Sequence, residues 1–284
     1  MILPPSIGHV ESMERSVGQV KLSFKRRSAT TVIAHMHQAG CGKVRLPRPT
    51  DAHHTEAVLI NLAGGLTGGD RLEWRVAWQP DTAATVSGQA AEKIYRAVGK
   101  SVATIETRLD VDANALALWL PQETILFDRA RFVRRNRFRV ARHGRLLAVE
   151  ASILGRRAMG ETVIAGRLDE SFEVHYADRL VLAEHQRFRG PIADLMAHPA
   201  VARGNAAFVS LLYVGENAAG QLDAIRDALG DAPAAASAPD PNVVVIRWLA
   251  VEPAGLRARL VAALFALQDA MGMPHRSLPR VWSC

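Results

Sequence analysis

Histidine and cysteine are the first residue types in this chain whose spacing suggests chemistry. His35 and His37 are two residues apart, which places both imidazoles on one side of a β-strand, and Cys41 follows four residues later. His53 and His54 form a second pair in a predicted loop. Imidazole and thiolate are good ligands for zinc and nickel. The spacing therefore makes His35, His37 and Cys41 a candidate metal site. Such pairs also occur by chance on polar strand faces, and no C-x-x-C or H-E-x-x-H motif supports this one.

The glycine-rich stretch at 61–70 suggests phosphate binding, but its spacing argues against it. Four of its residues from 64 to 69 are glycines, yet no lysine follows the last one and no G-x-G-x-x-G motif is present. The residues on either side have strand patterns, whereas phosphate motifs open a helix. We expect a loop that bends sharply or approaches another segment closely, with Asp70 held at its exit. No G-x-S-x-G motif points to a serine nucleophile either.

Arginines gather between residues 129 and 145, and most of this cluster fits one β-strand at 131–140. Alternation places two sets of side chains on opposite faces. One face carries Phe132, Arg134, Asn136, Phe138 and Val140, and the other carries Arg131, Val133, Arg135, Arg137 and Arg139. Three interpretations stay open: a solvated strand face, a nucleic-acid site, or a docking face for an acidic protein. The phenylalanines lie opposite most of the arginines, which counts against base stacking.

Composition limits the class of protein. The chain has 284 residues, a net charge of +7, only two cysteines and an aromatic content of 6%. Arginine supplies most of the positive charge, which suits pairing with carboxylates or phosphates. No apolar run approaches the roughly 20 residues of a membrane span, and the N-terminus lacks a signal-peptide core. We expect one cytoplasmic domain over residues 1–284, with a loose tail at 1–15.

Most of the chain has the pattern of β-strands separated by turns about 8–12 residues apart. Strands are predicted at 17–24, 30–38, 55–62, 71–79, 83–87, 93–98, 101–111, 115–120, 131–140, 146–154, 162–176, 179–189, 207–214 and 243–250. The segment 115–120 is apolar on both faces, which favours stacked sheets. Helices are predicted late, at 191–197, 218–229 and 253–271, and an Ala/Pro-rich linker at 231–241. The sequence therefore predicts a mainly β fold of stacked sheets with two or three C-terminal helices.

Six short blocks, in order, carry a resemblance to a known family. They are residues 42–47 (GKVRLP), 62–70 (LAGGLTGGD), 89–96 (QAAEKIYR), 119–125 (WLPQETI), 154–161 (LGRRAMGE) and 278–282 (LPRVW). Together they resemble the urease accessory protein family UreD, called UreH in some organisms. The resemblance implies sheets that are helically wound, as in a β-solenoid or a sandwich-like fold. It also implies a protein that performs no catalysis.

The resemblance further implies a set of partners and a cargo. A UreD-like protein would bind the urease structural subunits and recruit UreF, and through UreF the GTPase UreG, for nickel insertion into urease. No cofactor would be bound stably, and Ni²⁺ would only be in transit. Nucleic acid and membranes are not expected partners. Trp282, in the last block, is a candidate for partner contact or for locking the helices to a sheet.

Carboxylates beside these blocks are candidates for a nickel passage. They are Asp70, Glu92 and Glu161 as first choices, then Glu123, Asp128 and Glu150. Hard oxygen ligands hold nickel weakly, and an ion in transit must be able to leave each site. Pairing of such carboxylates with arginine is the structural alternative.

Two other functions stay open from the residues alone. A β-sandwich or β-solenoid glycan hydrolase would use paired carboxylates such as Glu150 and Glu161, about 5–9 Å apart in a cleft walled by aromatics. The low aromatic content counts against that function. A basic nucleic-acid binder is the third possibility, and a salt titration of DNA binding would test it.

Overall fold

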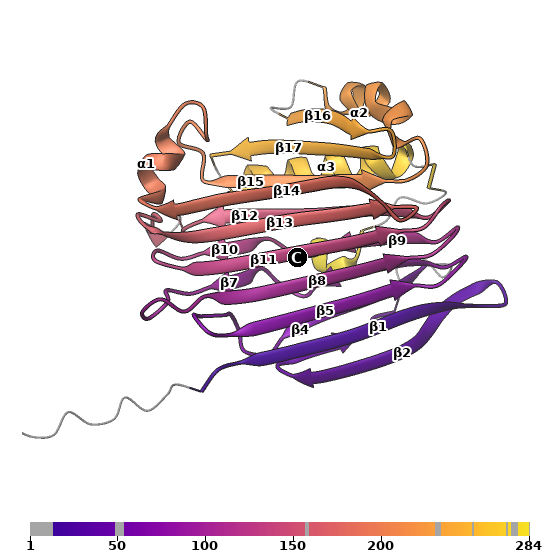
Figure 1. Cartoon of the computed structure of the whole chain (residues 1–284), viewed down its shortest axis with the longest axis horizontal. Coiled ribbons are helices and arrows are strands. Elements are labelled where there is room, and N and C mark those ends of the chain that lie inside the picture. Colours follow the sequence, from indigo (N-terminus) through magenta and orange to yellow (C-terminus); the bar gives the residue numbers. More distant parts are fainter. Residues whose placement is uncertain are drawn as a thin grey trace, which may run out of the picture.

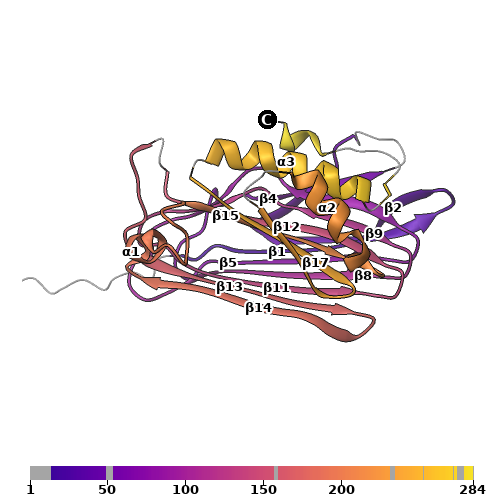
Figure 2. The ribbon, with the colours of Figure 1, turned by 90° about the horizontal axis from the view of Figure 1, so that it is seen from above.

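The computed structural model describes residues 14–48, 54–156, 159–230, 234–251, 253–270, 272–273 and 278–283. Within these ranges the chain forms two β-sheets that pack face to face, with the two longest helices on the outer side of one sheet (Figures 1 and 2). One sheet has seven strands, in the order β14 (Arg179–Gly190), β13 (Gly166–Tyr176), β11 (Arg131–Val140), β8 (Ala103–Val111), β5 (Arg71–Trp78), β1 (Val17–Arg27) and β2 (Thr30–Gly40).

The second sheet has ten strands in the described part of the chain. Its main order is β16 (Ala234–Asp240), β17 (Val243–Ala250), β15 (Ala207–Val214), β12 (Arg145–Leu154), β9 (Leu116–Leu120), β6 (Ala83–Gly88), β4 (Thr55–Asn61) and β3 (Gly42–Arg45). Two short strands, β10 (Thr124–Leu126) and β7 (Glu92–Ile94), pair with each other in parallel, and β10 also pairs with β12.

The chain alternates between the two sheets as it advances. It passes from β4 in the ten-stranded sheet to β5 in the seven-stranded sheet and back to β6, and β8, β9, β11, β12 and β13 continue the alternation. Successive strands within each sheet are therefore parallel, as in the runs β5–β8–β11–β13 and β4–β6–β9–β12. The helically wound, solenoid-like β fold is confirmed.

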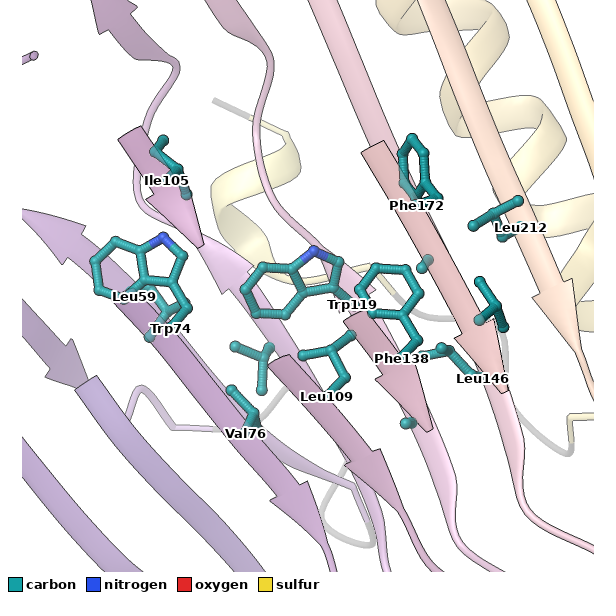
Figure 3. Packing of buried hydrophobic residues seen from close by; sticks show 14 of the residues in the cluster. Leu59, Trp74, Val76, Ile105, Leu109, Trp119, Phe138, Leu146, Phe172 and Leu212 are labelled. Atoms are coloured by element: carbon teal, nitrogen blue, oxygen red, sulfur yellow. The ribbon is translucent and has the colours of Figure 1, made fainter. Parts of the chain in front are cut away.

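The main core lies between the sheets. Alternate residues of each strand point inward, so that Phe24, Trp78, Phe132 and Phe138 are fully buried. Figure 3 shows side chains from both sheets meeting in this layer, including Trp74 from β5 beside residues of the opposite sheet.

A second core lies on the far side of the ten-stranded sheet. Strand β9 is buried on both faces, as its uniformly apolar sequence predicts: Trp119 points into the main core and Leu118 into the second one. The helices α2 (Leu222–Leu229) and α3 (Pro253–Ala270) pack against this side, with the short helices η2 (Ala218–Gln221) and η3 (Arg280–Trp282). The remaining helix, α1 (Ile192–Ala197), follows β14. Figure 2 shows α2 and α3 over one sheet, while none of the helices in the described ranges covers the outer face of the seven-stranded sheet.

The predicted linker at 231–241 is wrong over most of its length. Residues 234–240 form β16, an edge strand antiparallel to β17. Small alanine side chains fit against the buried β17, and Pro239 lies where the pairing register shifts, a position that tolerates a missing N–H donor. Residues 231–233 lie outside the described residues. The sequence also missed the short strands β3 and β10, and the predicted strand at 93–98 is the three-residue β7.

The glycine-rich loop carries the chain from one sheet to the other. Leu66 pairs with Ile94 in an isolated parallel bridge, and its N–H donates to the carbonyl of Lys93 at 2.7 Å. Gly65 has a φ of +151°, and a Cβ there would lie 2.4 Å from the Tyr95 ring and 2.9 Å from the Lys93 carbonyl oxygen. The expected close approach of backbone is thus confirmed, and it concerns the segment that carries β7.

Replacing Gly65 by Ala should therefore destabilise the fold more than replacing Gly64 by Ala. Gly64 also has a positive φ, but nothing lies within 4 Å of the position that a Cβ would take there. We expect roughly 1–2 kcal/mol for the backbone effect at Gly64 and about 1–3 kcal/mol more at Gly65 from the clash. Urea unfolding of both variants measures the difference, and equal stabilities would contradict the packing described.

Candidate functional site

A cavity of about 380 Å³ lies between the two sheets. Its apolar walls include Trp74, Ile105 and Trp119, of which Figure 3 shows the packing. Its four charged residues come from three separate segments of the chain: Glu92 and Lys93 from β7, Arg134 from β11 and Glu150 from β12. The winding of the chain brings these segments together, since neighbouring turns of the solenoid contribute one short stretch each.

Arg134 is the centre of a polar network in this otherwise apolar layer. It lies on the inner face of β11 and only 3% of the residue is exposed. Its guanidinium donates to Glu150 and to Glu170, each at 2.6 Å, which makes two buried ion pairs. It also donates to the hydroxyls of Thr124 and Ser152, each at 2.9 Å. Because β11 belongs to one sheet and β10 and β12 to the other, Arg134 ties the two sheets together.

Two carboxylates share this one guanidinium. Glu150 accepts a further hydrogen bond from Trp119 Nε1 at 3.2 Å. Burial raises the pKa of Glu150 to about 7, and repulsion from Glu170 adds to that rise, while Arg134 opposes it. Glu150 thus titrates near neutral pH, and Arg134 remains charged.

This shift predicts how stability depends on pH. The folded pKa of Glu150, about 7, lies above its ordinary value of 4.5, so the folded state holds its proton more tightly. The stabilisation is fully present below pH 4.5 and is lost as the pH rises through 7. Between about pH 5 and 8 we expect wild-type stability to fall by about 1–3 kcal/mol relative to Glu150→Gln, which carries no titrating group there. Urea midpoints across that range test this, and parallel profiles would contradict it.

Glu92 is the second acidic side chain of the cavity. It accepts a hydrogen bond from Asn61 Nδ2 at 3.0 Å, and burial raises its pKa. Glu92 is the register partner of Thr124, which is in turn the partner of Ser152. One row of the sheet therefore runs from Glu92 to the two hydroxyls that Arg134 contacts.

A buried amide extends the polar character of this layer. Asn136 lies two residues after Arg134 on the same inner face and is 1% exposed, and neither amide atom has a hydrogen-bond partner among the described residues. Its register partner is Thr107, which lines the cavity. Buried polar atoms of this kind usually bind ordered water.

The other four passage candidates do not line this cavity. Asp70 accepts the N–H groups of Ser16 and Thr67 at 2.9 and 2.7 Å, so it is held at the exit of the glycine-rich loop as expected. Asp128 accepts two backbone N–H groups, from Ile164 and Ala165. Asp70, Glu92 and Glu161 are the first choices for the carboxylates of one passage. Of these three, only Glu92 lines this cavity.

Ion pairs hold the remaining two candidates. Glu123 binds Arg257 of α3 at 2.9 Å, and Glu161 binds Arg156 at 2.7 Å. Both pairs follow the structural alternative of arginine pairing. The separation also counts against the glycan hydrolase, because Glu150 lines the cavity and Glu161 does not.

The structure does not bring the proposed metal ligands together into one group. His35 and His37 are exposed on the edge strand β2, whereas Cys41 is half-buried beyond its end, and burial raises the pKa of its thiol. No group of three or more metal-ligating side chains forms among the described residues. His54 lies near Thr85, with 2.6 Å between Nε2 and Oγ1, and His53 lies outside the described residues.

The two faces of β11 follow the predicted alternation. Arg135, Arg137 and Arg139 are exposed and Arg131 is half-exposed, while Arg134 and Asn136 are buried. Trp282 is not available to a partner, since it is 4% exposed and its Nε1 donates to the Leu120 carbonyl at 3.1 Å. It locks the end of the chain onto the ten-stranded sheet, which was the other expected role.

Sequence reasoning missed the importance of Arg134 and did not find Glu170. The available signal was the position of Arg134 on the same face as Phe132 and Phe138, because an arginine on an apolar face requires a buried partner. Which carboxylates would serve could not be read from spacing, since Glu150 and Glu170 lie on later turns of the solenoid.

None of the helices in the described ranges has the length and apolar character needed to cross a membrane. Fold and site together define a solenoid-like β protein with a polar chamber between its sheets. The chain belongs to the UreD family of urease accessory proteins, whose family model matches residues 16–283.

Individual relatives agree with the family match. The chain is 42% identical to the urease accessory protein UreD of Rhizobium etli, over 95% of this chain and 96% of that protein. It is 37% identical to the UreD of Agrobacterium fabrum, over 95% and 92% of the two chains, and 37% identical to the UreD of Sinorhizobium medicae, over 95% and 96%.

Proposed function

We propose that this protein is a urease maturation factor of the cytoplasm. It binds urease apoprotein and recruits UreF, and through UreF the GTPase UreG, so that nickel reaches the urease active site. It makes and breaks no covalent bond itself. The family match over nearly the whole chain is the observation that carries this role.

The cavity between the sheets supplies a passage for Ni²⁺ in this proposal. Glu92 offers an oxygen ligand at the cavity wall, and Gln122 and Thr124 add neutral oxygens. Oxygen ligands bind nickel more weakly than imidazole or thiolate, so an ion can leave them again.

Arg134 limits how long the ion stays. Its guanidinium lines the same cavity and already occupies Glu150. A divalent cation near Glu150 is repelled by this fixed positive charge, which acts strongly in a poorly solvated layer. Glu92 is therefore the main acidic contact in the passage, and Glu150 chiefly holds Arg134 in place.

The outer face of the seven-stranded sheet is the proposed docking surface. Arg135 and Arg137 are more than half exposed, and their ion pairs with Glu106 and Glu173 measure 3.3 Å each. Exposed pairs of this kind contribute little to stability, so a partner's carboxylates can replace them. Arginine is also enriched at protein interfaces.

Co-expression tests the proposed role as a whole. A host carrying a urease operon is compared with the same host lacking only this gene. We expect the protein to co-purify with the urease subunits, and urease from the deletion strain to be poor in nickel and inactive. Normal maturation of active urease in the deletion strain would overturn the proposal.

A further inference from the structure

One row of basic side chains crosses four neighbouring strands on the outer face of the seven-stranded sheet. Lys21, Arg75, Arg108 and Arg137 are successive register partners on β1, β5, β8 and β11. These four strands lie side by side in Figure 1 and are parallel. Side chains in register on one face of a sheet are neighbours, so the four positive charges form a line perpendicular to the strands, here called the basic row.

Folding alone does not account for the basic row. Like charges directly opposite one another on neighbouring strands destabilise a sheet. The arginines are relieved by ion pairs. Arg75 pairs with Glu73 and Arg108 with Glu106, each two residues back on the same strand, the second pair at 3.8 Å. Arg137 pairs at 3.3 Å with Glu173, its register partner on β13. Lys21 forms no ion pair with any described residue. The exposed fractions of the Arg75, Arg108 and Arg137 side chains are 41, 42 and 60%, so all three can reach a partner.

The spacing of the row matches one kind of partner. Neighbouring strands lie about 4.8 Å apart, so four strands place the charges over about 14 Å. An α-helix rises about 1.5 Å per residue, so carboxylates at positions i, i+3, i+7 and i+10 lie on one face and span about 15 Å. We propose that the basic row binds an acidic α-helix of a partner protein, laid across the strands.

The neighbouring row favours a protein over a nucleic acid. Glu73 and Glu106 are register partners and lie directly beside the basic row. These two glutamates would repel the phosphates of a nucleic acid, because its phosphates would extend beyond the basic row. A helix avoids this repulsion, because its flanks can carry lysine or arginine opposite these two glutamates.

This inference gives the chemistry of the docking surface proposed above, and its test does not depend on urease. A fluorescent helical peptide of about 18 residues carries glutamate at i, i+3, i+7 and i+10, and a scrambled peptide has the same composition. Fluorescence anisotropy with the full-length protein, at about 50 mM and 300 mM salt, measures both affinities. We expect the ordered peptide to bind about tenfold more tightly than the scrambled one at low salt, and this preference to shrink at high salt.

Matched variants separate the row from overall charge. Arg108→Glu with Arg137→Glu should weaken binding of the ordered peptide about tenfold. Arg142→Glu with Arg187→Glu makes the same change in net charge away from the row, and should alter the affinity less than about twofold. If the row variant fails to fold, Arg108→Gln with Arg137→Gln replaces it, with an expected loss of about threefold.

Three results would overturn the inference. Equal losses of affinity in the row variant and the control variant would show that binding depends on net charge and not on the basic row. Equal affinity for the ordered and scrambled peptides would show that the helical spacing of the glutamates does not matter for binding. Tighter binding of a DNA duplex than of the peptide would assign the row to nucleic acid. Loss of peptide binding with normal urease maturation would leave the proposed function standing.

Discussion

Replacing Arg134 by Met is expected to lower the free energy of unfolding by about 3–5 kcal/mol. The substitution keeps most of the side-chain volume but leaves Glu150 and Glu170 buried without their cation. It also removes the donor for Thr124 and Ser152. The two sheets would lose their polar link in the middle of the sandwich. Urea unfolding at pH 7, followed by tryptophan fluorescence, measures the change.

Two further variants show that the effect belongs to the network. Arg135→Met changes the next residue of β11, which points outward, and should alter stability by less than about 0.5 kcal/mol. Adding Glu150→Gln and Glu170→Gln to Arg134→Met should recover part of the loss, because no unpaired charge then remains buried. If Arg134→Met were no more harmful than Arg135→Met, Arg134 would not hold the sheets together.

Local features of the fold could be predicted from the sequence. The alternation in β11 identified its buried face, and the double-sided apolar pattern of β9 predicted cover on both sides. The glycines of the loop predicted a close backbone approach, which occurs at Gly65. In each case the signal lies within a few neighbouring residues, where strand geometry fixes the direction of each side chain.

The composition of the site could not be predicted in the same way. Arg134 meets Glu170 through the register of β11 with β13, and it meets Glu150 across the gap between the two sheets. No local pattern records either contact. Position beside a family block does not separate the roles of the acidic residues: Asp70, a first choice for the passage, caps a loop, and Glu123, a second choice, anchors α3 through Arg257. Strand β16 was missed because its pairing with β17, and not its own alanine-rich sequence, makes it a strand.

Glu92→Gln is expected to reduce nickel loading of urease about threefold or more without disturbing assembly. Gln keeps the shape and the hydrogen-bonding capacity of the side chain but removes the charge that attracts the cation. Glu92 forms no ion pair with any described residue, so the loss of its charge breaks no salt bridge there. Its pKa is raised by burial, and nickel transfer should therefore also fall as the pH is lowered and Glu92 becomes protonated.

Glu161→Gln is the matched control. Glu161 is also a half-buried acidic residue beside a family block, but it binds Arg156 and does not line the cavity. The same chemical change should therefore leave nickel loading at the wild-type level. A loss at both positions would point to a general effect of charge or stability.

The most direct measurement is the nickel content per urease active site, taken together with the amount of each variant that co-purifies with urease. A passage through the cavity predicts that Glu92→Gln yields assembled but nickel-poor urease, whereas Glu161→Gln matches the wild type in both quantities. Full nickel loading with Glu92→Gln, or a parallel loss of nickel and of co-purification, would contradict it.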